Sequence, residues 1–432
     1  MDAINVAIIC NHQGNWIRKT KPLNSSESVV NPAVGIDRIG DHKIIKISYL
    51  ELYKLHGPSK TMKKINDILC ENMVGIVVYF CDEKLPFPIE YFSELRRSYF
   101  IAMYTGDDEH NFDKSVKYYS QACDLMLTDN CFLEKRYELY GVDAITFPVF
   151  PGFYYAPQIN NHKVEKIYDV CFFGDVNNKV GRKEFLTHLI KNNINIKIYG
   201  PGTLAGVVSL DEMIRIIRSS KIALNLSGLA KTSALDTDLT INWRMRGTKG
   251  RIYDNSLLGT FLLTEVSPGI EEFFDVGNEI DIFRDQDELL EKVRFYLKND
   301  VLREEMAIRG YERAFREYDD VRGWKKFFNL VDHKIEAKNK KTSSFKDIIY
   351  KDPVFKRVYS SFHLFQMIKV LMKGNFGQAL EEFLIFIKYP LIDCGSFSFH
   401  IKNDLTGFMG GIKWLRILVR KLRKYKNNVN EI

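Results

Sequence analysis

The chain has 432 residues, of which 45% are hydrophobic and 27% charged, and its formal net charge is +7. This composition excludes an intrinsically disordered protein, and the length predicts two or three folded domains instead of a single hydrophobic core. The seven cysteines are scattered and include no C-x-x-C pair, so we expect neither a disulfide framework nor a zinc site.

The charge is distributed unevenly along the chain. Lys and Arg outnumber Asp and Glu more than twofold in residues 335–432, whereas the rest of the chain is slightly acidic. This asymmetry predicts an anionic partner for the tail, either a membrane surface or a nucleic acid. The first apolar run has no basic region before it, and nowhere do 18 apolar residues follow one another. We therefore expect a cytoplasmic protein that does not span a membrane.

The first part of the chain alternates apolar strands with helical stretches. A helix is predicted over 60–72, and strands are predicted over the following ranges: 4–10, 44–50, 74–80 and 99–105. Strands separated by helices predict a parallel sheet with helices on both faces. The strands are almost continuously apolar, which is typical of a sheet that is buried on both faces.

A stretch rich in proline and polar residues interrupts this alternation and predicts a linker over 151–166. A second set of strands follows, over 167–174, 194–200, 221–227, 260–265 and 279–283. The pairs Ser209 with Glu212 and Asp285 with Glu288 predict capping boxes at two helix starts. We therefore expect an α/β fold with the following parts: a first doubly wound domain over 1–150, a second doubly wound domain over 167–334, and a helical basic region over 335–432.

The second domain carries basic residues at two predicted helix starts. A helix over 249–258 begins with Lys249, Gly250 and Arg251, and Arg244 lies just upstream. Free backbone N–H groups at a helix start bind phosphate, and a glycine lets the phosphate approach the backbone. The alternative is an ordinary solvated basic helix start.

The second basic helix start follows the strand 167–174, where Gly174 precedes Lys179, Arg182 and Lys183. The G-x-G-x-x-G spacing of a dinucleotide site is missing. Open parallel sheets bind ligands at the carboxyl ends of their strands. We therefore expect a ligand site there, in which the basic residues and glycines bind a diphosphate and Asp254 accepts hydrogen bonds from sugar or ribose hydroxyls. The predicted residues are the following: Gly174, Arg182, Gly200, Arg244, Lys249, Arg251, Asp254, Thr264 and Glu265.

Residues 168–325 resemble the nucleotide-binding half of GT-B glycosyltransferases, in particular the branch that includes the spore maturation protein CgeB. The matching stretches are YDVCFFG, GRKEFL, IKIYG, SSKIALNLS, GRIYDNSLLGTFLLTE and GIEEFF, followed by DELLEKVRFYLKNDVLREEMAIRGYERAFREY. The resemblance implies two Rossmann-like domains that face a cleft, with 1–150 as the acceptor domain and 167–334 as the nucleotide-binding domain. It also implies a nucleoside-diphosphate sugar as donor. It implies that Arg182 and Arg251 contact the donor diphosphate.

The resemblance also implies roles for two acids of the same domain. Asp254 occupies the place of a ribose-binding glutamate, and Glu265 lies near the donor sugar. Arg246 stands where many retaining relatives carry an acid, so the sequence leaves a retaining or an inverting outcome open.

The acceptor domain has candidates for the base that deprotonates an acceptor hydroxyl. Asp107, Asp108 and His110 follow the strand 99–105, and His12 follows the first strand. A carboxylate or histidine with a tuned pKa suits this proton transfer. The alternative for each residue is a solvated loop side chain. The Asp-x-Asp of 235–239 lies in a long polar insert, and we expect no metal ion and no cofactor besides the donor substrate.

The tail ends in a predicted amphipathic basic helix over 410–428. Such a helix lies in the interface of an anionic membrane, while docking on the core and a dimer contact are the alternatives. We expect a peripheral protein at the inner face of the membrane that transfers sugar to a glycan or lipid-linked acceptor in surface glycan synthesis. The alternative functions are a nucleotide-sugar epimerase and a non-catalytic protein that acts through its tail. The tail has no nucleic-acid-binding motif, so we do not expect nucleic acid as its partner.

Overall fold

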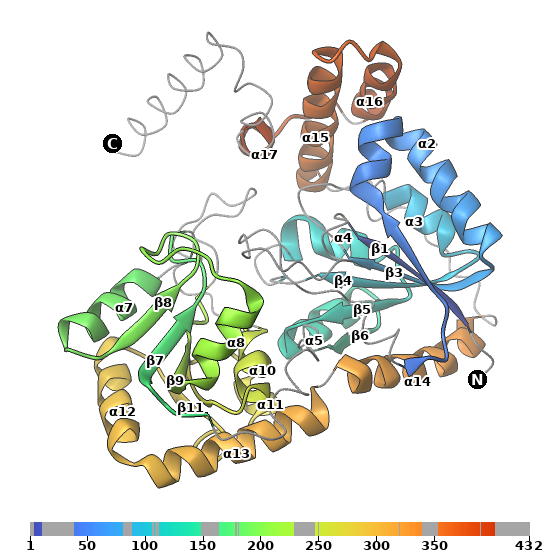
Figure 1. The fold of residues 1–432 in the computed structure, drawn as a ribbon. Coiled ribbons are helices and arrows are strands. Elements are labelled where there is room, and N and C mark those ends of the chain that lie inside the picture. The colour runs from blue at the N-terminus through green and yellow to red at the C-terminus, as the bar shows by residue number, and fades with distance from the viewer. Residues whose placement is uncertain are drawn as a thin grey trace.

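The computed structural model describes residues 4–10, 39–80, 89–105, 108, 112–147, 164–177, 179, 181–228, 247–248, 250–318, 320–338, 353–388 and 390–401. These residues form two parallel sheets, each flanked by helices, and a helical C-terminal region (Figure 1). The predicted fold class, two Rossmann-like α/β domains followed by helices, is therefore confirmed.

The first sheet has the strand order β2-β1-β3-β4-β5-β6, and all its strands run parallel. Its strands are β1 (Asn5–Cys10), β2 (Ile44–Ser48), β3 (Val74–Phe80), β4 (Phe100–Thr105), β5 (Leu125–Thr128) and β6 (Ala144–Thr146). The chain moves from β1 to β2 on one side and then crosses to β3 on the other. The point at which the strand order reverses therefore lies between β1 and β3.

The helices of the first domain are α2 (Tyr49–Glu71), α3 (Ile89–Leu95), the π-helix η2 (Phe112–Val116), α4 (Lys117–Ser120) and α5 (Cys131–Leu139). Helix α2 begins well before the predicted range of 60–72. It is interrupted at Gly57, whose φ of 77° and ψ of 177° are not helical, and Pro58 restarts it. Proline suits a first helical turn because the missing N–H has no intrahelical partner there.

The second sheet has the strand order β11-β10-β9-β7-β8, again all parallel. Its strands are β7 (Tyr168–Phe173), β8 (Ile196–Tyr199), β9 (Ser220–Asn225), β10 (Phe261–Glu265) and β11 (Asp281–Phe283). Its helices are α7 (Arg182–Lys191), α8 (Leu210–Arg218), α10 (Arg251–Leu257), α11 (Ile270–Phe273), α12 (Gln286–Lys298) and α13 (Asp300–Glu317). Here the strand order reverses between β7 and β9.

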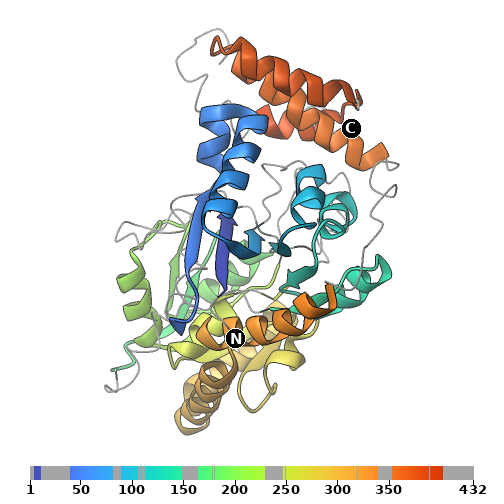
Figure 2. The same ribbon diagram turned by 90° about the vertical axis from the view of Figure 1, so that its right-hand side faces the viewer.

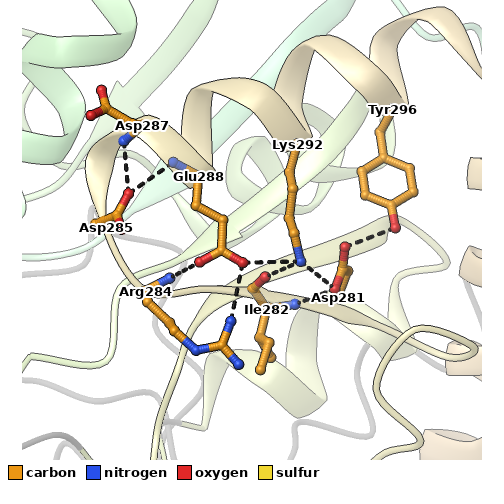
Figure 3. Close-up of polar contacts among 8 residues, drawn as sticks. All are labelled: Asp281, Ile282, Arg284, Asp285, Asp287, Glu288, Lys292 and Tyr296. Atoms are coloured by element: carbon orange, nitrogen blue, oxygen red, sulfur yellow. Dashed lines mark hydrogen bonds and ion pairs between the residues drawn. The ribbon is translucent and has the colours of Figure 1, made fainter.

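Both predicted N-caps are present, but neither forms a complete capping box, since the Glu212 carboxylate of α8 accepts from Arg215 instead of from Ser209 N. Ser209 Oγ accepts a hydrogen bond from Glu212 N at 3.2 Å and caps α8. Asp285 Oδ1 accepts from Glu288 N at 2.9 Å and caps α12 (Figure 3). The Glu288 carboxylate accepts from Arg284 N at 2.8 Å, one residue before the cap, so the reciprocal bond of a capping box is displaced by one position.

Lys292 joins α12 to the edge strand β11. Its ammonium donates to Asp281 Oδ1 at 2.9 Å and to the Ile282 carbonyl oxygen at 2.6 Å, while Tyr296 donates to the other oxygen of Asp281 (Figure 3). These contacts fix the orientation of α12 against the sheet. The neighbouring Leu289 and Val293 are fully buried in the core that β7, β9 and β10 share with this helix.

The chain returns to the first domain after α13. Helix α14 (Asp320–Lys338) buries Trp324, Phe327, Phe328 and Val331 against one face of the first sheet. The Trp324 and Phe147 rings lie 5.5 Å apart between centroids. Side chains of α14 therefore complete the core on that face.

Helices α15 (Pro353–Leu371), α16 (Phe376–Lys388) and α17 (Cys394–His400) follow, and α15 and α16 form a hairpin beside α2 (Figures 1 and 2). Tyr359 and Phe362 of α15 are buried in the core on the opposite face of the first sheet. Docking on the core, one of the three alternatives for the C-terminal region, is thus observed for α15 and α16. No helix among the described residues is long and apolar enough to cross a bilayer.

Candidate donor-binding site

Arg251 lies where the strand order of the second sheet reverses. Its guanidinium donates from Nη1 to the Phe173 carbonyl oxygen at 2.9 Å, at the end of β7. It also donates from Nη2 to the Leu226 carbonyl oxygen at 3.3 Å and from Nε to Asn225 Oδ1 at 3.2 Å, at the end of β9. One side chain from the start of α10 therefore spans both strand ends, at the place where open α/β sheets bind ligands.

Arg182 reaches the same place from the start of α7. Its Nη1 donates to the Asp175 carbonyl oxygen at 2.9 Å, and its Nη2 donates to the Leu226 carbonyl oxygen at 3.1 Å. Arg182 is only 2% exposed, whereas Arg251 is half-buried. The Leu226 carbonyl oxygen accepts from both arginines, so the two positive charges are held close together.

Gly174 lies between the two guanidinium groups. A Cβ at this position would be 2.5 Å from Arg251 Nη1 and 2.8 Å from Arg182 Nη1. The Phe172 ring lies below them, with its centroid 5.7 Å from Cζ of each arginine. The ring face attracts both cations, and the carbonyl oxygens offset part of their mutual repulsion. A pair of neighbouring guanidinium groups favours an anion with several oxygens, such as a diphosphate.

Gly200 packs directly against Gly174 at the end of β8. A Cβ on Gly200 would lie 2.3 Å from the Gly174 carbonyl oxygen, and its φ of +129° is one that other residues rarely adopt. Gly174 N donates to the Tyr199 carbonyl oxygen at 2.9 Å. The structure therefore brings together four predicted residues: Gly174, Gly200, Arg182 and Arg251.

Thr264 and Glu265 lie behind the arginine pair and are almost fully buried. Glu265 Oε2 accepts from Ser227 N at 2.8 Å and from Gly228 N at 3.2 Å, just beyond β9. Thr264 Oγ1 accepts from Asn225 Nδ2 at 2.9 Å, and Asn225 in turn accepts from Arg251. Both side chains thus support the loop that holds Arg251, and their contact with a donor sugar stays a prediction.

Helix α10 is mostly buried in the core of the second domain. Asp254 is half-buried, while Ile252, Tyr253 and Leu257 are buried in the core. Burial raises the pKa of the Tyr253 phenol well above its ordinary value, with smaller contributions from Tyr318 and from Asp129 of the first domain. This phenol therefore stays protonated.

Asp108 is the described candidate from the first domain. It is fully buried, and its Oδ2 accepts from the Tyr137 hydroxyl at 2.7 Å. The alternative of a solvated loop acid is therefore wrong for Asp108. The remaining candidates lie outside the described residues: Asp107, His110, His12, Lys249, Arg244 and the segment 410–428.

Sequence reasoning missed Asn225 and Phe172, which support the arginine pair. Asn225 is the polar residue within the apolar strand KIALNLS, and that contrast was the available signal. Phe172 could not be distinguished from other core aromatics before the sheet order was known. Within the described residues, no group of three His, Cys, Asp or Glu could hold a metal ion.

Residues 182–328, from α7 into α14, match a protein-family model described as glycosyl transferase-like. No curated protein matches the chain. The sucrose-phosphate synthase from Thermosynechococcus elongatus is similar in fold, with a TM-score of 0.52 and 9% identity, over 77% of this chain and 100% of that one. A glycosyltransferase from Rickettsia africae is also similar, with a TM-score of 0.51 and 10% identity, over 78% of this chain and 100% of that one.

A third similar structure is Anabaena HepE in complex with UDP-glucose. Its TM-score is 0.51 and its identity 8%, over 76% of this chain and 100% of that one. The narrower resemblance to the CgeB branch stays a prediction. The chain thus has the GT-B fold of glycosyltransferases, and residues 182–328 match the glycosyl transferase-like family.

Proposed function

We propose that the protein is a glycosyltransferase that binds a nucleoside-diphosphate sugar at the carboxyl edge of its second sheet. The observation that carries this proposal is the Arg182 and Arg251 pair, held around Gly174 where the strand order reverses. The match to the glycosyl transferase-like family supports it. A uridine nucleotide is the first donor to test, because HepE, which shares the fold, was solved in complex with UDP and with UDP-glucose.

In the proposed reaction, the acceptor hydroxyl oxygen forms a bond to the anomeric carbon of the sugar. The bond between that carbon and the diphosphate oxygen breaks, and the nucleoside diphosphate leaves with the electron pair. The arginine pair stabilises the negative charge that develops on the leaving diphosphate. Of the residues proposed for the donor, Asp254 would bind ribose hydroxyls, and Lys249 and Arg244 would add positive charge.

The acceptor proton passes to a base of the first domain, for which Asp107, Asp108 and His12 remain the candidates. Asp108 is buried against Tyr137, so of the three candidates we assign it a positioning role and propose Asp107 or His12 as the base. His12 follows the last residue of β1 by two positions, and β1 borders the point where the first sheet reverses its strand order.

The proposed acceptor is a glycan or a lipid-linked glycan of surface polysaccharide synthesis. The basic segment 410–428 would hold the protein against the anionic inner face of a membrane, where a lipid-linked acceptor is found. The proposed mechanism uses no metal ion, since it assigns the stabilisation of the leaving group to arginines.

Replacement of Arg251 tests the proposal. Arg251→Ala is expected to weaken UDP binding at least about tenfold, because charge-assisted hydrogen bonds contribute roughly 1.5–3 kcal/mol each. Arg251→Lys keeps the charge but loses the forked geometry, so an intermediate loss is expected. The measurement is calorimetric titration of UDP and UDP-glucose into each variant, with circular dichroism to establish that it is folded.

The matched control is Arg309→Ala. Arg309 Nε also donates to a backbone carbonyl oxygen, that of Asn278 at 2.8 Å, but in the loop that precedes β11 at the other edge of the sheet. Equal nucleotide affinities for folded Arg251→Ala and Arg309→Ala would contradict the proposed donor site.

A further inference from the structure

Helix α16 turns a continuous apolar face outward. Five large apolar side chains on it are exposed: Phe376 (74%), Leu380 (58%), Phe383 (41%), Leu384 (50%) and Ile387 (45%). Their spacing of four, three, one and three residues places them on one side of the helix. Folded monomers rarely expose so many large apolar side chains together, and such patches mark interaction surfaces.

The inner face of α16 carries two buried polar residues, Gln378 and Glu382, beside Ala379 and Ile385, which pack toward the core. Glu382 is fully buried, and its carboxylate accepts from the Tyr53 hydroxyl of α2 at 2.5 Å. Its other oxygen lies 2.7 Å from Nδ1 of the buried His363 of α15. Gln378 Nε2 donates to the Tyr53 carbonyl oxygen at 3.3 Å.

These buried contacts fix the rotation of α16 about its own axis. A helix turned the other way would bury its apolar face, but it would leave Tyr53 and His363 without their carboxylate partner, which is costly in a buried site. The outward apolar face is therefore specified by the fold of the hairpin.

The charges around this face indicate what covers it. Lys373, just before α16, and Lys388, its last residue, are both exposed, so each end of the helix is basic. The chain beyond residue 401 contains eight Lys or Arg and only two Asp or Glu. An apolar face flanked by basic residues is typical of helices that lie in the interface of an anionic membrane.

The position of α16 in the molecule suits such contact. Helices α15 and α16 lie at the outer end of the first domain, and α16 is the outermost of the two (Figure 2). The second sheet lies at the other end of the molecule (Figure 1). A flat surface can therefore approach α16 without meeting the second domain.

We propose that the outward face of α16 inserts into the interface of an anionic membrane and holds the first domain against it. This inference deepens the proposed function, because it places the acceptor domain where a lipid-linked acceptor would be found. The vesicle-binding test needs neither donor nor acceptor. The membrane proposal can therefore fail while the proposed transferase activity stands, and the transferase activity can fail while the membrane proposal stands.

The test is co-flotation of the full chain with vesicles of phosphatidylcholine and phosphatidylglycerol, and with vesicles of phosphatidylcholine alone. The paired substitution Leu380→Gln with Leu384→Gln is expected to weaken binding to the mixed vesicles about tenfold or more, because it removes two leucines from the inserted face. The difference should persist at high salt, where attraction through basic residues is screened.

The control is the paired substitution Val301→Gln with Ile308→Gln on α13. These side chains are 74% and 57% exposed, so they match the leucines in exposure and differ in place. We expect the control to bind vesicles as the unaltered chain does. Equal binding of the Leu380 and Leu384 variant to mixed vesicles, at low and at high salt, would overturn the proposal. The proposal would also be overturned if light scattering showed a dimer for the unaltered chain and a monomer for the Leu380 and Leu384 variant while vesicle binding stayed the same. The apolar face would then pair two copies of the chain.

Discussion

Gly200 and Gly174 allow two strand ends to approach within backbone contact. The Gly174 carbonyl oxygen occupies the space that a side chain on Gly200 would need. The closeness of these strand ends lets Arg182 and Arg251 bracket Gly174 without a side chain between them. Gly174, just after β7, therefore leaves room for the two guanidinium groups.

We expect Gly200→Ala to destabilise the fold by roughly 2–4 kcal/mol, because it adds a steric clash to an unfavourable φ. Gly277→Ala is the matched control: its φ is +88°, and no atom lies within 4 Å of the added Cβ. We expect Gly277→Ala to lower the free energy of unfolding by about 1 kcal/mol, through backbone strain alone. Urea denaturation of both variants makes the comparison, and equal losses would show that the contact with Gly174 is not important.

At the scale of single elements, helix α12 depends on its first turn. Asp285 accepts from Asp287 N at 3.0 Å and from Glu288 N at 2.9 Å, so it satisfies two N–H groups that have no partner within the helix (Figure 3). The same turn places Lys292 over Asp281. The cap therefore also orients the helix against the edge strand.

Asp285→Ala is expected to cost about 1 kcal/mol of folding free energy, the usual value for a lost N-cap. Glu291→Ala removes an exposed acid from the same helix and should change stability by less than about 0.5 kcal/mol. Thermal denaturation followed by circular dichroism measures both. A loss for Asp285→Ala no larger than that for Glu291→Ala would show that the cap adds nothing.

The strands of the second sheet were predictable to within about two residues, because long apolar runs bounded by glycine and charged residues are strong local signals. Strands β5 and β6 were not predicted as strands. They have four and three residues, and their conformation depends on pairing within the sheet.

Within the described residues, Gly174, Gly200, Arg182 and Arg251 lie together as the sequence predicts, but their contacts were not predictable. The resemblance implied that Glu265 lies near the donor sugar, but its contacts with the Ser227 and Gly228 backbone were not predicted. These contacts depend on how β9 and β10 lie side by side, which no local pattern contains. The same is true of the orientation of helix α16, which depends on a contact with Tyr53, more than three hundred residues earlier.

At the scale of the whole molecule, the Tyr53 hydroxyl connects the first domain to the C-terminal hairpin. Burial, and then the charge of Glu382, raise the pKa of this phenol well above its ordinary value, so it keeps its proton and donates to the carboxylate. The contact joins α2 to α16. Its loss would loosen the hairpin without touching the second domain.

Tyr53→Phe is expected to reduce stability by about 1–3 kcal/mol, because it leaves a buried carboxylate oxygen without its donor. Hydrogen exchange should become faster in residues 376–388, while UDP affinity stays unchanged. Tyr140→Phe, which alters a 40% exposed tyrosine at the end of α5, should affect neither. Unchanged exchange in α16 for Tyr53→Phe would show that other contacts hold the hairpin.

The return of the chain to its first domain has a consequence for biosynthesis. Trp324 packs against Phe147 and Phe362 joins the opposite core, so both faces of the first sheet need side chains made after the second domain. A ribosome that adds about 5–20 residues per second takes roughly 10–35 s to pass from Phe147 to Trp324. During that interval the nascent first sheet exposes apolar surface, whereas residues 164–318 emerge as one uninterrupted segment. We therefore expect the second domain to complete its folding first, and the domain that begins the chain to be the last to complete its core.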